Sequence, residues 1–211
     1  MHPALKDLIL RYPDLEACSE AITKAFELLV DSYRNKGKLL VCGNGGSASD
    51  SEHIVGELMK GFMCKRPVQP EYRNRLIEMY PEDGEYIASH LQGALPAISL
   101  VSHTSLTSAF INDQSADLVY AQQVYGYGRK GDSIIGISTS GNSKNVVFAI
   151  KVAKSLGLRT IGFTGKTGGK LGELCDVTIK IPYDSTPVVQ ERHLPVYHTL
   201  CIMLEQEFFK E

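Results

Sequence analysis

Two stretches rich in glycine and hydroxyl side chains could hold a phosphate group. The first reads Cys-Gly-Asn-Gly-Gly-Ser-Ala-Ser over residues 42–49, and the second reads Ser-Thr-Ser-Gly-Asn-Ser over residues 138–143. Each directly follows an apolar run and precedes a helical pattern. Glycine lets the backbone approach a ligand closely, and the free N–H groups at the start of a helix attract anions. The hydroxyls of the second stretch are further hydrogen-bond donors, so the pattern predicts a phosphate site.

Both stretches also have other interpretations. The first could be a tight strand-to-helix turn, and in the second Ser140 could be an ordinary helix cap, although capping explains only one of four hydroxyls. The first also fits the dinucleotide fingerprint Gly-x-Gly-x-x-Ala, which needs an acid at the end of the second strand. The second apolar run ends in Leu-Val-Ser-His at 100–103, without an acid, which disfavours a dehydrogenase. Residues 165–170 lack the Walker spacing, so we interpret them as a polar turn.

Two pairs of side chains could do acid–base or metal chemistry. His53 and Glu57 are four residues apart on a predicted helix, so they share one face and are suitable zinc ligands. Such a pair alone is more often a surface contact. Gln190 and His198 are eight apart, or about 12 Å along a helix. They reach one ion only if it lies midway, if the helix bends, or if they serve different subunits.

Composition excludes several classes of partner. The chain has 211 residues, of which 43% are hydrophobic, and 22 basic against 24 acidic residues give a formal charge of -2. This balance gives no reason to expect a nucleic-acid or membrane partner. No apolar run approaches the ~18 residues of a membrane-spanning helix, and the N-terminus lacks signal-peptide features. Five cysteines without a Cys-x-x-Cys pair indicate reduced thiols in the cytoplasm, with Cys42 expected in the core.

The elements that must position these residues follow from the apolar pattern. Apolar residues three and four apart from Leu15 to Tyr33 predict an amphipathic helix. Helical patterns separate several of five short apolar runs, and the first four runs are nearly continuous in apolar character, which is typical of parallel strands covered on both faces. We therefore predict an α/β domain with an open parallel sheet. The expected strands are 38–42, 96–101, 133–137, 160–163 and 177–181.

Residues 67–95 do not fit the strand–helix alternation. They are rich in charge, and we expect one or two short helices, broken near Pro81 and Gly84. The segment is longer than a normal connection, which indicates either a lid or an oligomer contact.

The motifs together resemble the sugar isomerase (SIS) domain, and within it the phosphoheptose isomerases. Residues 42–57 and 136–143 carry the resemblance, and residues 164–170 and 190–198 extend it over nearly the whole chain except about 67–95. The resemblance implies a single domain over residues 1–211. It implies a three-layer SIS fold, with an open parallel sheet flanked by helices on both faces and a long N-terminal helix.

The resemblance also implies a reaction and a site. Sedoheptulose 7-phosphate would become D-glycero-D-manno-heptose 7-phosphate by enediolate aldose–ketose isomerisation, in a cytoplasmic homotetramer with active sites between subunits. Glu57 would be the catalytic base and His198 the acid. Zinc would be bound by His53, Glu57, Gln190 and His198. The sugar phosphate would contact Asn44, Gly45, Gly46, Ser47, Asn112, Asp113, Ser138, Thr139, Ser140, Ser143 and Gln190.

The chain also departs from the pattern of phosphoheptose isomerases. Val188 stands where they usually carry Arg, Lys60-Gly61 replaces a common Gly-Arg, and compact members lack the 67–95 insertion. These departures affect the identity of the sugar more than the reaction type. The alternative is a non-catalytic SIS protein that senses phosphosugars or binds the bacterial replication initiator. Such proteins can lose the acid–base residues, so Glu57 and His198 favour an enzyme.

Overall fold

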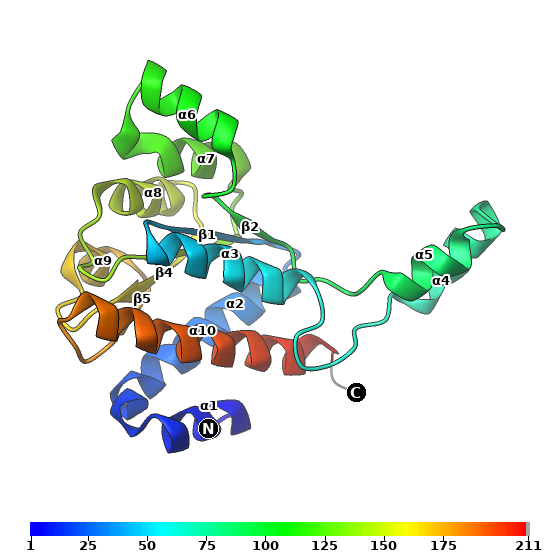
Figure 1. The fold of residues 1–211 in the computed structure, drawn as a ribbon, viewed down its shortest axis with the longest axis horizontal. Coiled ribbons are helices and arrows are strands. Elements are labelled where there is room, and N and C mark those ends of the chain that lie inside the picture. Colours follow the sequence, from blue (N-terminus) through cyan, green and yellow to red (C-terminus); the bar gives the residue numbers. More distant parts are fainter. Residues whose placement is uncertain (210–211) are drawn as a thin grey trace.

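Five parallel strands form one sheet at the centre of the computed structural model, which describes residues 1–209 (Figure 1). The order of the strands across the sheet is β2-β1-β3-β4-β5. All five predicted strands are therefore confirmed. Their bounds are Leu39–Gly43 for β1, Ala97–Ser99 for β2, Ser133–Ile137 for β3, Arg159–Thr164 for β4 and Val177–Lys180 for β5.

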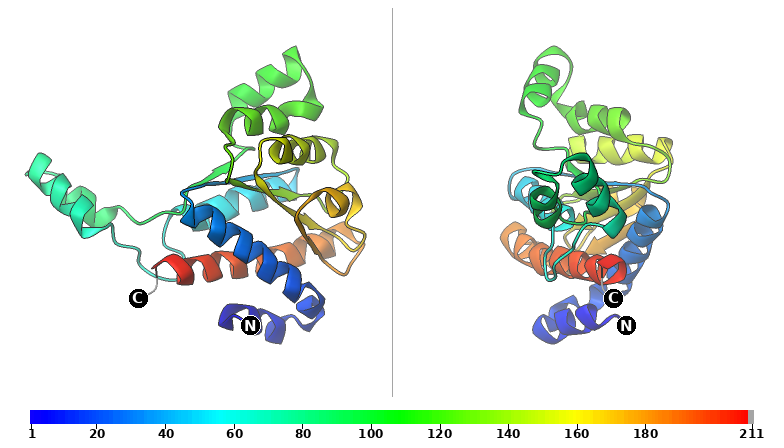
Figure 2. Two further views of the ribbon diagram at one scale, coloured as in Figure 1. Left: turned by 180° about the vertical axis from the view of Figure 1, so that it is seen from behind. Right: turned by 90° about the vertical axis from the view of Figure 1, so that its right-hand side faces the viewer.

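Helices cover both faces of this sheet, so the predicted three-layer fold is confirmed (Figures 1 and 2). Successive strand residues point to opposite faces: Val41 packs in one core with α2, α3 and α10, and Leu40 in the other with α7 and α8. The helices on the first face are α1 (Pro3–Arg11), α2 (Ser19–Arg34), α3 (Gly46–Met59) and α10 (Thr186–Phe209). The others are α6 (Thr104–Asp113), the 3-10 turn η2 (Ala116–Leu118), α7 (Val119–Tyr127), α8 (Lys144–Ser155) and α9 (Gly169–Leu174).

The N-terminal apolar stripe is buried as predicted, but it is divided between two elements. Leu15 and Cys18 lie in a 3-10 helix, η1 (Pro13–Cys18), and only the residues from Ser19 onward belong to α2. Pro13 has a fixed φ and no N–H, so it begins η1 and separates it from α1. The long helix of the N-terminal region is thus α2, preceded by two shorter elements.

Residues 67–95 form an arm that projects from the body (Figures 1 and 2). It consists of two helices packed on each other, α4 (Pro70–Met79) and α5 (Gly84–His90). The expectation of one or two short helices, broken near Pro81 and Gly84, is therefore met by two helices. No residue of α4 is buried. An isolated antiparallel bridge between Pro67 and Gln92 closes the base of the arm.

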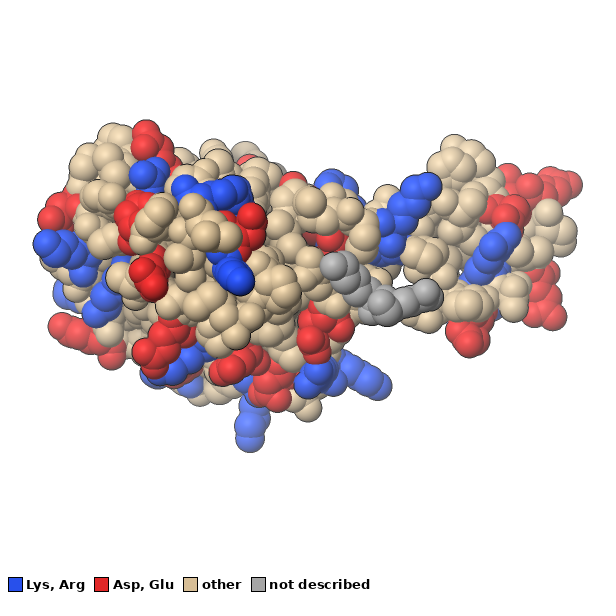
Figure 3. All heavy atoms as spheres, turned by 90° about the horizontal axis from the view of Figure 1, so that it is seen from below, with Lys and Arg blue, Asp and Glu red and all other residues tan. Residues whose placement is uncertain are grey.

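Within residues 1–209, no helix is both long and apolar enough to cross a membrane. All five cysteines are free thiols. Cys42 is completely buried in the core that includes α7 and α8, as expected. Lys and Arg side chains are interspersed with Asp and Glu on the face shown in Figure 3.

Candidate active site

The two glycine- and hydroxyl-rich stretches form neighbouring loops at one edge of the sheet. The first loop, residues 43–47, follows β1, and the second loop, residues 138–143, follows β3. Gly43 and Ile137 are paired in register at the ends of these adjacent strands. Because β2 and β3 flank β1 on opposite sides, the loops lie where the strand order reverses. Ligands of open α/β sheets bind in the crevice at this position.

Three hydroxyls of the second loop form one cluster at the start of α8. The Oγ of Ser138 lies 2.9 Å from the Oγ of Ser143 and 3.5 Å from that of Ser140. Ser143 occupies the N-cap position of α8, yet no side-chain cap hydrogen bond is formed there. Ser140 accepts from the Asn142 N–H within the loop. The fourth hydroxyl, of Thr139, faces Thr186 at the start of α10. Helix capping therefore does not account for these hydroxyls.

The polar turn at residues 165–170 packs against the second loop and forms hydrogen bonds with it. Gly141 has a φ of 68°, and a Cβ built on it would lie 1.9 Å from the Gly168 carbonyl oxygen, so only glycine fits here. The Lys170 N–H donates to the Asn142 side chain, and the Gly165 N–H donates to the Thr139 carbonyl. The turn thus holds the shape of the loop, in agreement with its interpretation as a polar turn.

The first loop is tied to α8 through Asn44. Its side-chain amide exchanges two hydrogen bonds with the amide of Asn145, at 2.9 and 3.0 Å. The Tyr120 hydroxyl donates to the Gly43 carbonyl at 2.7 Å and lies 3.2 Å from the Asn44 amide oxygen. The sequence analysis missed Asn145 and Tyr120, because their role depends on contacts between segments far apart in the chain.

Gln190 of α10 also lies against the first loop. A Cβ on Gly46 would lie 2.6 Å from the Gln190 Nε2, so glycine is needed for this close approach. The next residue, Ser47, is buried, and its carbonyl accepts from the Ser51 hydroxyl at 2.8 Å. The structure therefore brings Asn44, Gly46 and Gln190 together at the N-terminal end of α3.

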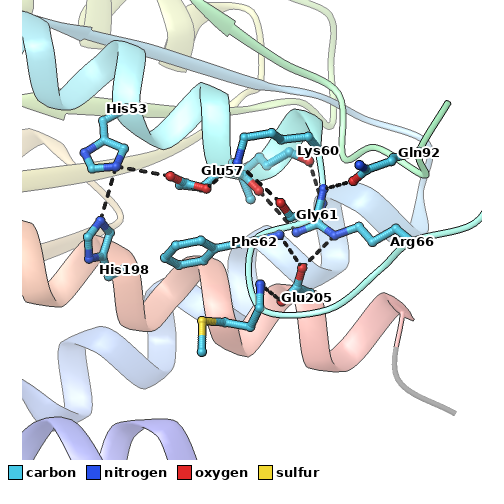
Figure 4. Close-up of polar contacts among 11 residues, drawn as sticks. His53, Glu57, Lys60, Gly61, Phe62, Arg66, Gln92, His198 and Glu205 are labelled. Atoms are coloured by element: carbon cyan, nitrogen blue, oxygen red, sulfur yellow. Dashed lines mark hydrogen bonds and ion pairs between the residues drawn. The ribbon is translucent and has the colours of Figure 1, made fainter. Parts of the chain in front are cut away.

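Further along α3, His53 and Glu57 meet His198 of α10 (Figure 4). His53 and Glu57 share one face of the helix, with 3.2 Å between the His53 Nε2 and the Glu57 Oε1. The His198 Nε2 lies 3.4 Å from the His53 Nε2. The Lys60 ammonium donates to the other Glu57 oxygen at 3.0 Å. The predicted base and acid thus lie in one cluster of His53, Glu57 and His198.

Burial shifts the titration of the groups around this cluster. Desolvation and the neighbouring His53 lower the pKa of His198 below its ordinary value. Desolvation raises the pKa of Asp50. Desolvation and Asp50 raise the pKa of the Tyr197 phenol, which is 2% exposed. The neutral forms of His198 and Tyr197 are therefore favoured at neutral pH.

The donor atoms of the cluster are of the kinds that bind zinc, but they do not form a complete set of zinc ligands. Two imidazole nitrogens and a carboxylate are typical zinc ligands, and bonds of about 2.0 Å to a tetrahedral ion place neighbouring ligands about 3.3 Å apart. The two distances from the His53 Nε2 agree with this spacing. However, within residues 1–209 no three His, Cys, Asp or Glu side chains are positioned to hold a metal ion. Gln190 contacts Gly46, about two turns of α3 away from His53.

Asn112 and Asp113 lie away from this cluster. They end α6, which packs with α7, on the opposite side of the sheet from α10 (Figure 1). Both are exposed, and the Asn112 amide donates to the Asp113 carboxylate at 2.8 Å. A single chain therefore does not bring these two predicted residues to His53, Glu57 or His198.

A buried ion pair holds the backbone beside Glu57 in place (Figure 4). The Arg66 guanidinium donates to the carbonyls of Glu57 and Leu58, at 3.1 and 2.8 Å, and so satisfies the C-terminal end of α3. Its Nε donates to the Glu205 carboxylate of α10 at 2.8 Å, and both side chains are almost fully buried. The sequence analysis missed this pair.

Comparison with known proteins places this site in a family. A model of the SIS domain matches residues 11–75 and 75–165. A phosphoheptose isomerase of Geotalea daltonii is 41% identical over 92% of this chain and 87% of its own, and that of Aliarcobacter butzleri is 39% identical over 92% and 88%. The solved phosphoheptose isomerase of Neisseria gonorrhoeae superposes with a TM-score of 0.75 at 32% identity, covering 95% of this chain and 94% of the other. The chain therefore belongs to the SIS domain family and, within it, to the phosphoheptose isomerases, a group of aldose–ketose isomerases.

Proposed function

We propose that this phosphosugar isomerase converts sedoheptulose 7-phosphate to D-glycero-D-manno-heptose 7-phosphate. The observation that carries the proposal is the combination of a triple-serine cluster at the start of α8 with a His53–Glu57–His198 cluster. The relatives named phosphoheptose isomerase support a seven-carbon sugar. Ser138, Ser140 and Ser143 bind the phosphate, while Asn44 and Gln190 are placed to contact the sugar.

In the proposed mechanism, protons move between neighbouring atoms of the sugar. Glu57 removes a proton from C1 of the ketose to give an enediolate and later returns a proton to C2. His198 transfers the proton of the C1 hydroxyl to the C2 oxygen. Its lowered pKa suits this role, because a largely neutral imidazole can accept a proton and release it again. Phosphate binding holds the reacting carbons in place.

Zinc is part of the proposal. One chain does not present a complete set of ligands, so His53, Glu57, His198 and Gln190 would hold the ion only in the assembled protein. A bound zinc ion would stabilise the negative charge that develops on the enediolate oxygens.

We also propose a homotetramer with active sites between subunits. Gly46 and Glu57 lie at opposite ends of α3, about 16 Å apart along its axis. A site within one subunit would need an almost fully extended substrate to reach both. A neighbouring copy could instead bring its own Glu57, or its Asn112 and Asp113, to the loops.

Incubation with five- to seven-carbon ketose phosphates, with added zinc or with a chelator, tests the proposed reaction. Products are followed by mass and NMR. We expect turnover of sedoheptulose 7-phosphate above all others, loss of turnover with chelator, and recovery with zinc. Preference for a shorter sugar would contradict the substrate assignment, and full activity in chelator would contradict the metal assignment.

A further inference from the structure

An amide pair connects the two loops through a residue that the proposed mechanism does not use. Asn145 is the second residue of α8, just after the second loop, and Asn44 belongs to the first loop. The Asn44 Nδ2 donates to the Asn145 Oδ1 at 2.9 Å, and the Asn145 Nδ2 donates to the Asn44 Oδ1 at 3.0 Å. Two residues 101 positions apart in the chain therefore hold each other's side chains.

The backbone of α8 determines the orientation of this pair. The Val146 N–H donates to the Asn145 Oδ1 at 3.0 Å. It lies in the first turn of α8, where backbone N–H groups have no carbonyl partner within the helix. Turning the Asn145 amide over would place its NH2 group against this N–H and against the NH2 group of Asn44. The Asn145 oxygen therefore stays toward Val146, and its Nδ2 donates to the oxygen of Asn44.

The pair leaves Asn44 with one kind of free hydrogen-bonding group. An asparagine amide has two N–H donors and one acceptor oxygen. The Asn44 oxygen accepts from Asn145 and lies 3.2 Å from the Tyr120 hydroxyl, and one N–H donates back to Asn145. Asn44 is exposed, and within residues 1–209 its second N–H has no hydrogen-bond partner. The group that Asn44 has available for a ligand is therefore a donor.

A donor at this position suits a sugar phosphate. Phosphate, carbonyl and hydroxyl oxygens all accept hydrogen bonds, whereas an amide oxygen at the same point would repel a phosphate or carbonyl oxygen. Without Asn145, the Asn44 amide could rotate and present either its oxygen or its NH2 group. Holding the amide in one orientation before the ligand arrives lowers the entropic cost of binding.

We propose that Asn145 is a positioning residue that holds Asn44 as a hydrogen-bond donor to the sugar phosphate. The proposal rests on the proposed function, in which Asn44 contacts the sugar. Asn145 acts through Asn44 and not by touching the ligand. Its removal should therefore have no effect on binding once the Asn44 side chain is gone.

A double-mutant cycle tests this dependence. Asn44→Ala, Asn145→Ala and the variant with both changes are compared with the wild type by KM and kcat for sedoheptulose 7-phosphate. The matched control is Asn35→Ala, because the exposed Asn35 amide donates to Asp31 at the end of α2. Asn145→Asp, made with and without Asn44→Ala, separates positioning from helix stabilisation. It keeps an acceptor for the Val146 N–H near the N-terminus of α8, where a carboxylate is favourable, but removes the donor to Asn44.

Side-chain NMR of the free protein, labelled with 15N-asparagine, detects the amide pair without any substrate. The Asn44 signals are assigned by their loss in Asn44→Ala. In the wild type we expect one Asn44 side-chain proton to be more protected from solvent exchange than the other. In Asn145→Ala the two protons should exchange alike.

We expect KM to rise about three- to tenfold in Asn145→Ala, with a smaller change in kcat, and no further rise when Asn145→Ala is added to Asn44→Ala. Asn145→Asp should unfold like the wild type, and its rise in KM should be larger with Asn44 present than in the Asn44→Ala background.

Three results would overturn the proposal: a wild-type KM in Asn145→Ala, the same rise in KM with and without Asn44, or equal protection of the two Asn44 protons in the wild type. Absence of heptose phosphate turnover by the wild type would instead overturn the proposed function. The NMR result would then decide whether Asn145 holds Asn44.

Discussion

The Nε2 atoms of His53 on α3 and His198 on α10 lie 3.4 Å apart, although the residues are 145 positions apart in the chain. The parallel sheet explains how they meet, because α3 follows the first strand and α10 follows the last, and both pack on the same face. The sheet also brings the two loops to one edge. The fold thus places phosphate-type loops at one end of α3 and the acid–base cluster toward the other.

Loss of one serine hydroxyl in the second loop should weaken substrate binding. Ser143→Ala removes a hydroxyl that lies 2.9 Å from Ser138 at the start of α8. A hydrogen bond to a charged group contributes about 1.5–3 kcal/mol, so KM should rise roughly ten- to hundredfold, with a smaller effect on kcat. The matched control is Ser155→Ala at the other end of α8, where the hydroxyl donates to the Val152 carbonyl. Equal KM values in the two variants would contradict the phosphate assignment.

A shared active site predicts complementation between two impaired variants. Ser138→Ala/Ser143→Ala damages the second loop, and Glu57→Gln damages the base. If one subunit supplies the loop and another supplies Glu57, mixed oligomers contain some intact sites. Co-refolding the two proteins should therefore restore part of the activity at low substrate concentration, and refolding either one alone should not. A mixture no more active than its components would place loop and base in one subunit.

The buried Arg66–Glu205 pair predicts a pH-dependent contribution to stability. Burial alone would raise the pKa of Glu205, but hydrogen bonds from the Phe62 and Met63 amides and from Arg66 lower it. The stabilisation is therefore fully present above the ordinary glutamate pKa of about 4.3 and is lost as the pH falls through the lower folded-state value. Glu205→Gln should reduce the free energy of unfolding by about 3–5 kcal/mol at pH 7, because the Arg66 charge stays buried without its partner.

Urea unfolding of both proteins between pH 7 and pH 3 measures this difference. The gap between wild type and Glu205→Gln should narrow as the pH falls below the ordinary glutamate value. A constant gap across this range would mean that ionisation of Glu205 does not stabilise the fold.

Removal of the arm should leave the body folded. Replacing residues 70–90 by a short Gly-Ser linker deletes α4, none of whose residues is buried, and α5. The free energy of unfolding, measured in urea, should change by no more than about 1 kcal/mol. Two further measurements on the same variant separate the two predicted roles of the arm. If the arm is an oligomer contact, its removal changes the sedimentation of the protein. If the arm is a lid, its removal changes the KM for the sugar phosphate. A large loss of stability would show that the arm is part of the body's core.

The sequence predicted the layers of the fold well because its local signals agree with the global structure. The apolar runs of β1 and β3 are buried on both faces, and the glycine-rich stretches that follow them lie at strand ends as expected. The split between η1 and α2 was not predicted, because a 3-10 turn and an α-helix carry similar apolar spacing over one turn.

The site was predicted less completely, for two physical reasons. Tyr197 and Glu205 sit in an apolar helical stripe, so their polar contacts with Asp50, His53 and Arg66 depend on which segments pack against α10. Asn112 and Asp113 were predicted at the site from the resemblance alone, and in one chain they end α6, on the opposite side of the sheet from α10.

Exchange of solvent hydrogen catalysed by Glu57→Gln tests the central claim most directly. In deuterated water the wild type should incorporate deuterium at C1 or C2 of the sugar during turnover, which NMR detects. Glu57→Gln should bind the sugar phosphate and unfold like the wild type, yet lose about 10²–10⁴-fold in both exchange and isomerisation. The exposed Glu16→Gln variant should behave as wild type. Near-normal exchange by Glu57→Gln would contradict the assignment of Glu57 as the base.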